Sequence, residues 1–562
     1  MMAHTPCTFC GSPFDVPLED LEFLKRIAVE LGGKRFEIPT PKLCPPCRFR
    51  RRLSYRNEYS YFPRSCSKCS ARVISVHRPD VAYPVYCHSC WWGDTWSPYE
   101  YGLDYDPSRS FLDQFRELRD RVPQLAMMND NGVTSENCEY TQDFAFGKNC
   151  YLVTASWQVR DSMYGTQNNH ASDCLDCFVV SVHSELLYEC SYSERLYNSV
   201  FLSHSSGCSG CWFGRDLIGC TDCFGCVGLR QKTFCFFNEQ LSEAEYRSRV
   251  ASLQLNTVTG FAAARESFEQ FSNTIPERAQ YQINCEDCVG DGLFNCKNVV
   301  GSGFINAQHC RYVWMGDAPV NSYDLLNTGM PEWCYEGCTP DNSYMTHFTT
   351  WCWKCKHVLY SDNCHSSSHL FGCIGIRQGE YSILNRRVDA STYASTVEEI
   401  IGNMEERGEW GEFFALEHSP FPYNDSRAFD LFPESPDTVL RWRARWGEPL
   451  PDGAPRPVRA VPEDLSAPES EILSSVYGCH ECRRPFRIVP QELSFYRKMT
   501  LPPPTRCPNC RRKDRFGRRP SSGTLYPSSC DACGQPVLSV YPAEGRGKKR
   551  VHCTDCAQRS AV

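Results

Sequence analysis

The chain of 562 residues has no long apolar run, and no stretch approaches the about 18 apolar residues of a membrane-spanning helix. Residues 1–7 carry neither a basic stretch nor an apolar core, so we expect no signal peptide and a cytoplasmic location. The sequence also lacks a P-loop, a dinucleotide-binding fingerprint, a His-Glu-x-x-His motif and a G-x-S-x-G motif. These absences favour a protein that is not an enzyme, with no membrane partner and no identified small-molecule substrate.

A strong net charge is missing as well. The formal charge of -8 excludes a uniformly basic protein, but the charges are segregated along the chain. Residues 1–100 hold 14 basic and 10 acidic side chains, residues 479–562 hold 17 and 6, and residues 101–478 hold 28 and 51. Two basic ends, of net charge +4 and +11, therefore flank an acidic middle of net charge -23.

Cysteine, by contrast, is abundant: 37 residues, in a chain far too long for a small disulfide-stapled scaffold. A hydrophobic content of 41% is enough for real cores, and the length is typical of about three to four domains. In a reducing cytoplasm, clustered cysteines are metal ligands more often than disulfides.

Sixteen of the cysteines form eight Cys-x-x-Cys knuckles, four at each end of the chain. Paired in order, the knuckles are separated by 33, 17, 24 and 19 residues, and the 17 and 19 are typical of zinc ribbons. Interleaved pairing remains an alternative. Two knuckles make a tetrahedral cage of four thiolates, so we predict four closed, structural Zn²⁺ sites. The predicted ligands are Cys7, Cys10, Cys44, Cys47, Cys66, Cys69, Cys87, Cys90, Cys479, Cys482, Cys507, Cys510, Cys530, Cys533, Cys553 and Cys556.

The two ends are copies of one another. Residues 7–14 (CTFCGSPF) align with residues 479–486 (CHECRRPF), and residues 44–48 (CPPCR) align with residues 507–511 (CPNCR). Such an internal duplication predicts one zinc-ribbon module that occurs twice.

Basic residues gather behind the knuckles of both copies. Arginines beside aromatic rings suit phosphate backbones and unstacked bases, so we predict contacts with nucleic acid, either RNA or DNA. Two alternatives remain open: a solvated face, or docking on the acidic middle of the same chain or of a neighbouring copy. The predicted contacts are Arg48, Arg50, Arg51, Arg52, Arg56, Arg511, Arg512, Lys513, Arg515, Arg518, Arg519, Lys548, Lys549 and Arg550.

The other 21 cysteines lie between residues 138 and 373, and many of them fall on a ladder with a step of 12. The local pattern is a small turn residue and then Cys or Ser, as in Asn149-Cys150 and Asp161-Ser162. Short β-prone runs at such a period predict a parallel β-solenoid in which small side chains stack inside the coil. Two steps, or about 24 residues, would approach one turn of a β-helix.

Two other uses of these cysteines remain open. One is a thiolate cluster for zinc or iron–sulfur, made by Cys208 and Cys211 with Cys220, Cys223 and Cys226. The other is disulfide formation, which conflicts with the expected compartment.

The middle is duplicated too, because residues 223–238 (CFGCVGLRQKTFCFFN) match residues 370–385 (LFGCIGIRQGEYSILN). A helix is predicted after each copy, one opened by the capping box Ser242–Glu245 and one over residues 391–407. Each helix would cap the open end of a solenoid block.

The fold class that we predict is mainly β: a central parallel β-solenoid with short helical caps, flanked by duplicated zinc-ribbon modules. A Pro-rich tether should let the C-terminal module move independently, while the N-terminal module docks on the solenoid. The predicted segments are 1–100 (N-terminal double zinc-ribbon module), 101–130 (helical connector), 131–272 and 273–432 (solenoid blocks with helical caps), 433–475 (Pro-rich linker) and 476–562 (C-terminal double zinc-ribbon module).

Four stretches resemble a known family: residues 43–53 (LCPPCRFRRRL), 83–94 (YPVYCHSCWWGD), 370–385 and 409–414 (EWGEFF). In these stretches the chain is similar to the large uncharacterised zinc-ribbon proteins of Candidate Phyla Radiation (Patescibacteria) bacteria. The resemblance covers most of the chain. It implies zinc binding and a bacterial cytoplasmic setting, and it implies no reaction or substrate.

Three hypotheses for function follow. The first is a non-enzymatic zinc-binding scaffold whose basic ends engage nucleic acid around an acidic β-solenoid. The second is a protein-interaction or self-assembly module whose basic ends bind the acidic middle of neighbouring copies. The third is an enzyme that acts in a groove of the solenoid, with carboxylates such as Asp173, Asp176 and Asp222 or with thiols.

Overall fold

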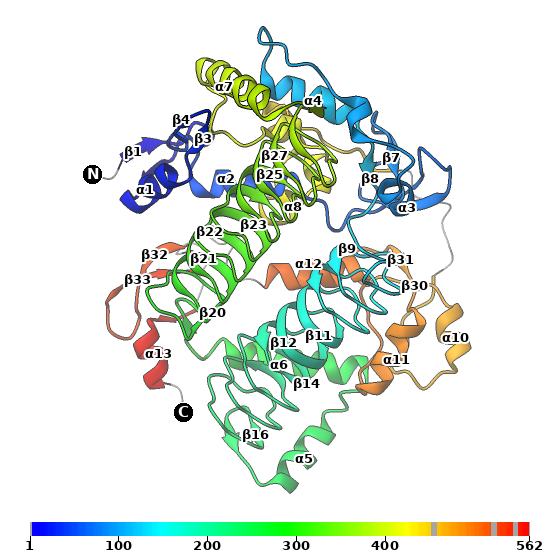
Figure 1. Cartoon of the computed structure of the whole chain (residues 1–562). Coiled ribbons are helices and arrows are strands. Elements are labelled where there is room, and N and C mark those ends of the chain that lie inside the picture. Colours follow the sequence, from blue (N-terminus) through cyan, green and yellow to red (C-terminus); the bar gives the residue numbers. More distant parts are fainter. Residues whose placement is uncertain (1–2, 451–457, 519–524, 543–548, 561–562) are drawn as a thin grey trace. The chain divides into compact units, whose positions relative to one another are not determined.

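The computed structural model describes residues 3–450, 458–518, 525–542 and 549–560 (Figure 1). The chain divides into two compact units. Unit 1 joins Met1–Met127 to Gln282–Glu448, and unit 2 joins Met128–Tyr281 to Pro449–Val562. Each unit therefore combines one cysteine-rich end of the chain with the middle segment that is not its neighbour in sequence. Among the described helices, none is long and apolar enough to cross a membrane.

The middle of unit 2, which we call the first block, is a seven-stranded parallel sheet. It ends in a short antiparallel hairpin, and two helices follow. The strands are β9 (Gln142–Ala145), β10 (Thr154–Trp157), β11 (Thr166–Leu175), β12 (Phe178–Tyr188), β13 (Ser191–Glu194), β14 (Tyr197–Ser203) and β15 (Trp212–Arg215), and then β16 (Cys235–Phe236) and β17 (Glu239–Gln240). The helices are α5 (Glu243–Ser252) and α6 (Val258–Ser272).

The middle of unit 1, the second block, repeats this plan. Its strands lie in sequence order, all parallel except for the last hairpin, and α7 (Ala390–Glu406) follows them (Figure 1). The strands are β19 (Gln282–Ile283), β20 (Leu293–Phe294), β21 (Lys297–Ile305), β22 (Gln308–Asp317), β23 (Tyr323–Gly329), β24 (Tyr335–Cys338), β25 (Tyr344–Thr350), β26 (Lys356–Leu359), β27 (Ser368–Phe371), β28 (Glu380–Ile383) and β29 (Arg386–Arg387).

Most neighbouring strands pair at a register of 12 residues, although the register is 11 at the start of the second block and 13 between β12 and β13. Val200 pairs with Trp212, which pairs with Phe224, which pairs with Phe236. The expectation of about 24 residues per turn is therefore wrong, because one step of 12 already separates stacked strands. A slip of one residue falls inside β11 and β12, where Asn169 pairs with Ser181 but Ala171 pairs with Ser184.

The chain bends because every third residue has a left-handed backbone. Asp161, Tyr164 and Gln167 have φ of 50°, 54° and 56°, and the pattern runs through both blocks. Asn, Asp and Gly tolerate this conformation best, which explains why the repeat places them before Cys or Ser. Both predicted helices are present, and Ser242 and Glu245 form the predicted capping box of α5.

The Cys and Ser ladder is buried, as predicted. Cys150, Ser162 and Cys174 are at most 3% exposed. The Ser162 hydroxyl donates to the carbonyl of Arg160 and accepts from the backbone N–H of Cys174, one step on, at 3.0 Å. Such bonds satisfy polar groups inside the stack, where an unpaired group would cost about 1–3 kcal/mol.

The cysteine-rich ends consist of short hairpins and helices. In unit 1 these are β1 (Ala3–Pro6), β2 (Pro13–Val16), α1 (Leu18–Arg26), β3 (Val29–Leu31), β4 (Lys34–Phe36), α2 (Pro45–Leu53), β5 (Phe62–Ser65), β6 (Arg72–Ser75), β7 (Val85–Tyr86) and α3 (His88–Trp92). The connector adds α4 (Phe111–Arg121) and β8 (Gln124–Leu125), and α8 (Arg427–Leu431) and α9 (Pro436–Arg441) follow the second block. In unit 2 they are α10 (Glu469–Ser474), β30 (Tyr477–Gly478), β31 (Pro485–Phe486), α11 (Pro490–Lys498), α12 (Pro508–Gly517), β32 (Tyr526–Ser529), β33 (Pro536–Ser539), β34 (Val551–His552) and α13 (Thr554–Ser560), and β34 pairs with β18 (Glu277–Arg278).

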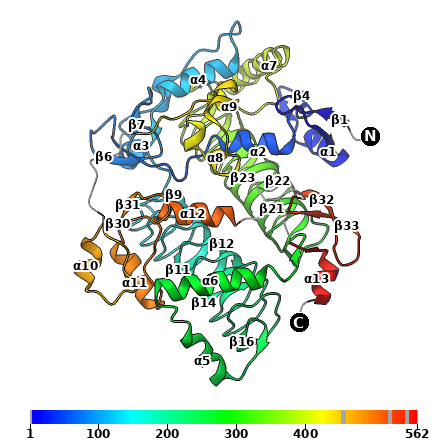
Figure 2. The same ribbon diagram turned by 180° about the vertical axis from the view of Figure 1, so that it is seen from behind.

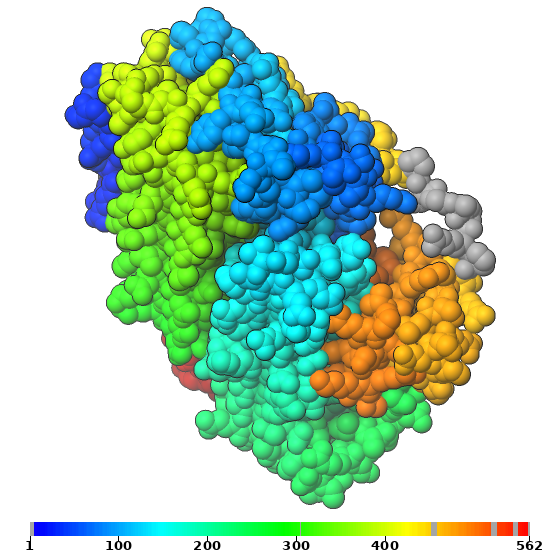
Figure 3. All heavy atoms as spheres, turned by 45° about the vertical axis from the view of Figure 1, so that its right-hand side comes forward, coloured from blue at the N-terminus to red at the C-terminus, as the bar shows by residue number. Residues whose placement is uncertain are grey.

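The C-terminal module does not hang free on its linker. Within unit 2, the Gln491 side chain donates to the carbonyl of Asn149, and Lys498 pairs with Asp173 at 3.2 Å. Figure 3 shows this orange part of the chain against the cyan first block. The expectation of an independently moving module is therefore wrong, and the predicted linker itself contains α9 and α10.

Candidate zinc centres and arginine helices

The sixteen predicted ligands gather into four groups of four. In each group the sulfur atoms lie within 4.8 Å of one another, and the knuckles pair in sequence order. This excludes the interleaved pairing. The groups are Cys7, Cys10, Cys44 and Cys47; Cys66, Cys69, Cys87 and Cys90; Cys479, Cys482, Cys507 and Cys510; and Cys530, Cys533, Cys553 and Cys556.

All four groups share one local design. The first knuckle is the turn of a two-stranded hairpin, and the second opens a helix. Cys44, Cys87 and Cys507 are the N-cap residues of α2, α3 and α12. Pro45 and Pro508 occupy the first helical position, where a missing N–H costs nothing.

The sulfur geometry fits zinc. Cys10 and Cys44 are 3.8 Å apart, as are Cys482 and Cys507, measured between Sγ atoms. A tetrahedral site with Zn–S bonds of about 2.3 Å places its sulfurs about 3.8 Å apart. The four groups can therefore each hold one Zn²⁺, and no fourth position is left open for a substrate.

The backbone prepares one cysteine of three sites as a thiolate. Although burial acts against it, backbone N–H groups of the same knuckle and of the facing knuckle lower the pKa of the Cys66, Cys479 and Cys530 thiols to about 6. The N–H of Cys507 donates to the Cys479 sulfur at 3.3 Å, and the N–H of Cys553 donates to that of Cys530 at 3.3 Å. Thiolates are the form that binds zinc.

The structure does not gather the described middle cysteines into a group that could hold a metal ion. No group of three or more lies within ligating range among the described residues outside the four zinc groups, and all 21 middle cysteines are described. The members of the candidate cluster are instead buried thiols that donate to backbone carbonyls: Cys208, Cys211, Cys220, Cys223 and Cys226. These cysteines are also free of disulfides.

The basic helix α2 lies on the second block and buries its arginines there. Arg48 and Arg52 both pair with Asp324 at 2.9 Å, and Arg52 also pairs with Glu336 at 2.8 Å. Arg52 is 0% exposed and Asp324 is 1% exposed. Although burial acts against the charged form, Asp324 holds the pKa of Arg48 above its ordinary value.

The helix α12 repeats this contact on the first block (Figure 2). Arg511 and Arg515 pair with Asp176 at 2.7 and 2.5 Å, and Arg515 lies 3.6 Å from Glu189. In both copies, the arginines are the first and fifth residues after the last zinc ligand of the helix. We call each of these contacts an arginine clasp.

In both clasps, the spacing of the arginines along the helix matches the spacing of the carboxylates on the block. Residues four apart on a helix face the same way and are about 6 Å apart along its axis. Asp324 and Glu336 occupy the same corner of neighbouring steps, both with left-handed φ, of 55° and 45°, and neighbouring strands are about 4.8 Å apart. Asp176 and Glu189, with φ of 59° and 56°, match them. Each helix therefore matches a column of two carboxylates.

The clasps bury several of the residues that were predicted to contact nucleic acid. Six of these side chains are buried in ion pairs within the chain and cannot reach a phosphate: Arg48, Arg51, Arg52, Arg56, Arg511 and Arg515. Docking on the chain's own acidic middle was one of the alternatives, and the structure adopts it. Arg50 pairs with Glu434 and Arg518 with Glu189, whereas Lys513 and Arg550 are exposed and Arg512 is half-buried. Lys549 is exposed and lies 3.7 Å from Glu277, while Arg519 and Lys548 lie outside the described residues.

The sequence analysis named only Asp176 among the four clasp carboxylates, and in another role; it missed Asp324, Glu336 and Glu189. Their signal was an acidic residue at the same turn position of consecutive steps, as in Asp324 and Glu336. The carboxylates named for an enzyme have similar roles: Asp176 is fully buried, Asp173 pairs with Lys498, and Asp222 pairs with Arg247.

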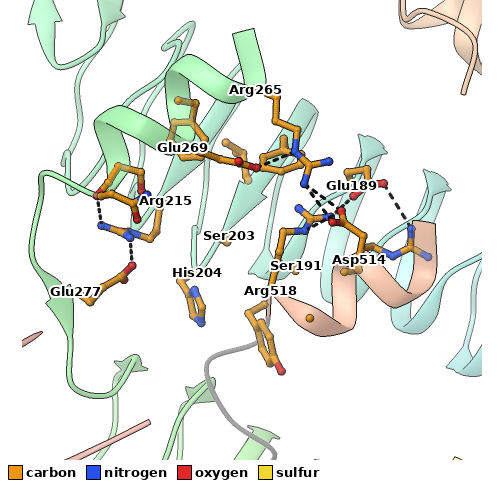
Figure 4. A pocket seen from close by; sticks show the side chains of 18 of the residues that line it. Glu189, Ser191, Ser203, His204, Arg215, Arg265, Glu269, Glu277, Asp514 and Arg518 are labelled. Atoms are coloured by element: carbon orange, nitrogen blue, oxygen red, sulfur yellow. Dashed lines mark hydrogen bonds and ion pairs between the residues drawn. The ribbon is translucent and has the colours of Figure 1, made fainter. Parts of the chain in front are cut away.

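Unit 2 also contains a cavity of about 800 Å³ between α6, α12 and the first block (Figure 4). Its cations face carboxylates of its own wall. Arg265 pairs with Asp514 at 3.1 Å, Arg215 with Glu277, and Arg518 with Glu189. These cavity cations are committed to carboxylates of the same wall, so we assign no ligand to the cavity.

Comparisons with protein-family models, with curated proteins and with solved structures find no match for this chain. The resemblance to zinc-ribbon proteins of Candidate Phyla Radiation bacteria therefore stays a prediction. The function is therefore inferred from the four cysteine groups and the two arginine clasps.

Proposed function

We propose that this protein is a non-enzymatic scaffold in which structural zinc holds two arginine helices against two closed β-solenoid blocks. The observation that carries the proposal is the double role of Cys44 and Cys507. Each is a candidate zinc ligand and also the N-cap of the helix that supplies the clasp. Zinc would fix where these helices start, and the clasps would fix where the modules dock.

The closed solenoid is supported by ladders around each step. Residues 12 apart pair in parallel at successive positions, as in Ser206 with Ile218, Ser209 with Thr221, Trp212 with Phe224 and Arg215 with Val227. A left-handed residue separates each position from the next. Four short sides with four turns return the chain to its start, one step higher.

Elemental analysis of the purified full chain tests the scaffold. We expect four zinc per chain, and Cys44→Ser should lower this to three and loosen the clasp on Asp324, because an incomplete cage binds zinc weakly. The control is Cys150→Ser, since serine already stands one step on at position 162. This control should keep all four. The proposal would be overturned if the chain contained iron, or if Cys150→Ser lowered the zinc content.

Nucleic-acid binding is a second candidate function. It is supported by basic residues that the clasps leave exposed on the C-terminal module, such as Lys513 and Arg550. Binding that weakens steeply with salt would support it, because phosphate contacts release counterions. Self-assembly through the clasps has less support, because each arginine column already pairs with carboxylates of its own chain.

A further inference from the structure

Three arginines on the third zinc knuckle stand apart from the clasps. Arg483, Arg484 and Arg487 lie on or beside the β30–β31 hairpin, and all three are exposed. Within the described part of the chain, none of the three has an ion pair, whereas nearby Arg506 pairs with Glu481 and Asp514. These three guanidinium groups, which we call the knuckle arginines, are therefore uncommitted.

The duplicated first knuckle shows that the zinc site does not need them. Gly11, Ser12 and Asp15 stand in the corresponding positions. The two turns have the same backbone bonds: the N–H of Cys7 donates to Ser12 at 2.9 Å, and that of Cys479 donates to Arg484 at 3.0 Å. The arginines thus add positive charge to a hairpin that also forms without it.

Position 483 adds a second observation, because its backbone is left-handed. Arg483 has φ of 62°, whereas the matching positions Gly11 and Gly534 have φ of 74° and are glycines; the second cysteine group has Ser70 there, with φ of 61°. A side chain other than glycine costs about 1–2 kcal/mol in this conformation. An arginine with no intramolecular partner at a strained position points to a use outside the chain.

We propose that the knuckle arginines bind the phosphodiester backbone of a nucleic acid. This inference rests on the second candidate function. It assigns the contact surface to the knuckle arginines instead of the clasp arginines, which are buried. Guanidinium groups match phosphate with two parallel hydrogen bonds. The large apolar side chains of the hairpin, Tyr477, Phe486 and Ile488, are all buried. A protein partner would need exposed apolar anchors, whereas a phosphate backbone needs only cations.

The test uses the full zinc-loaded chain and two variants, each with three fewer positive charges. The first is Arg483→Gly with Arg484→Ser and Arg487→Ser, in which the first two changes restore the residues of the first knuckle. The control is Arg72→Ser with Lys354→Ser and Lys356→Ser, which removes exposed charges elsewhere. Zinc content of both variants should equal that of the unmodified chain.

Binding is measured by fluorescence anisotropy with a labelled single-stranded RNA and, separately, a labelled DNA duplex. We expect the knuckle variant to lose affinity by at least about tenfold, and the salt dependence on RNA to fall by about two in log–log slope. The control variant should keep its affinity within about threefold.

Each other outcome has a distinct meaning. If the unmodified chain binds neither probe, both this inference and the nucleic-acid function are wrong. If it binds and both variants weaken equally, the function stands and the knuckle surface is wrong. If a polyglutamate peptide binds better than both probes and only the knuckle variant loses it, the partner is an acidic protein and the nucleic-acid assignment is wrong.

Discussion

Replacing Arg52 by methionine should destabilise unit 1 strongly. The side chain is 0% exposed and bridges two carboxylates, Asp324 at 2.9 Å and Glu336 at 2.8 Å. Methionine fills much of the same volume, so the change removes mainly the charge and its hydrogen bonds. Both carboxylates then stay buried with fewer donors.

The expected size follows from what remains. Removal of one partner of a buried ion pair costs about 3–5 kcal/mol. Asp324 keeps Arg48, and Glu336 keeps Arg51 at 3.0 Å, so neither charge is fully orphaned. We therefore expect about 3 kcal/mol, the lower end of that range. On the same helix, Arg50 is partly exposed and pairs with a partly exposed Glu434. Arg50→Met should thus cost about 0–1 kcal/mol.

Urea unfolding of the zinc-loaded chain, followed by tryptophan fluorescence, measures the difference. Ten of the twelve tryptophans lie in unit 1 and only Trp157 and Trp212 lie in unit 2, so the emission reports mainly on unit 1. The Arg52→Met midpoint should fall well below that of Arg50→Met, with a similar slope. Equal midpoints for the two variants would refute the clasp as a source of stability.

Three further predictions concern other parts of the chain. In unit 2, Arg515→Met should speed hydrogen exchange in α12 far more than Arg512→Met, because only Arg515 is buried against Asp176; equal exchange would contradict this. A thiol reagent should modify Cys285 and Cys288 before the other 19 middle cysteines, which are buried. Burial raises the pKa of Cys310 and Cys334 to about 12, so peptide mass spectra that show early labelling of these two would count against the buried ladder. Gly290→Ala should lower the thermal midpoint of unit 1 by several degrees, since the added Cβ would lie 1.6 Å from the carbonyl oxygen of Gly301. The control is Gly402→Ala in α7, whose added Cβ meets nothing within 4 Å, so this variant should be neutral or stabilising.

The four cysteine groups and the 12-residue step could be predicted because both are local patterns. A Cys-x-x-Cys turn places two thiolates together whatever surrounds it, and the pairing of Cys10 with Cys44 follows sequence order. The repeat was visible because each Asn-Cys or Asp-Ser pair marks a turn and a buried position. The number of steps per turn was not visible, since periodicity alone does not say which copies stack.

The fate of the basic residues could not be predicted for a different reason. Arg52 and the exposed Lys513 look alike in sequence, and only the long-range partner distinguishes them. Arg52 meets Glu336, which lies 284 positions away. The segregated charges predicted that the basic ends attract an acidic middle. They did not distinguish the middle of the same chain from that of a neighbouring copy.

The interleaved order of the units has a consequence for synthesis. The N-terminal zinc module docks on the second block, and the first block docks on the C-terminal module, so no single cut of the chain releases a whole unit. A ribosome adding about 5–20 residues per second needs about 14–57 s to travel from Arg52 to Glu336. During that time α2 is made but its carboxylates are not. The arginines of α2 are therefore synthesised long before the carboxylates that they pair with in the folded chain.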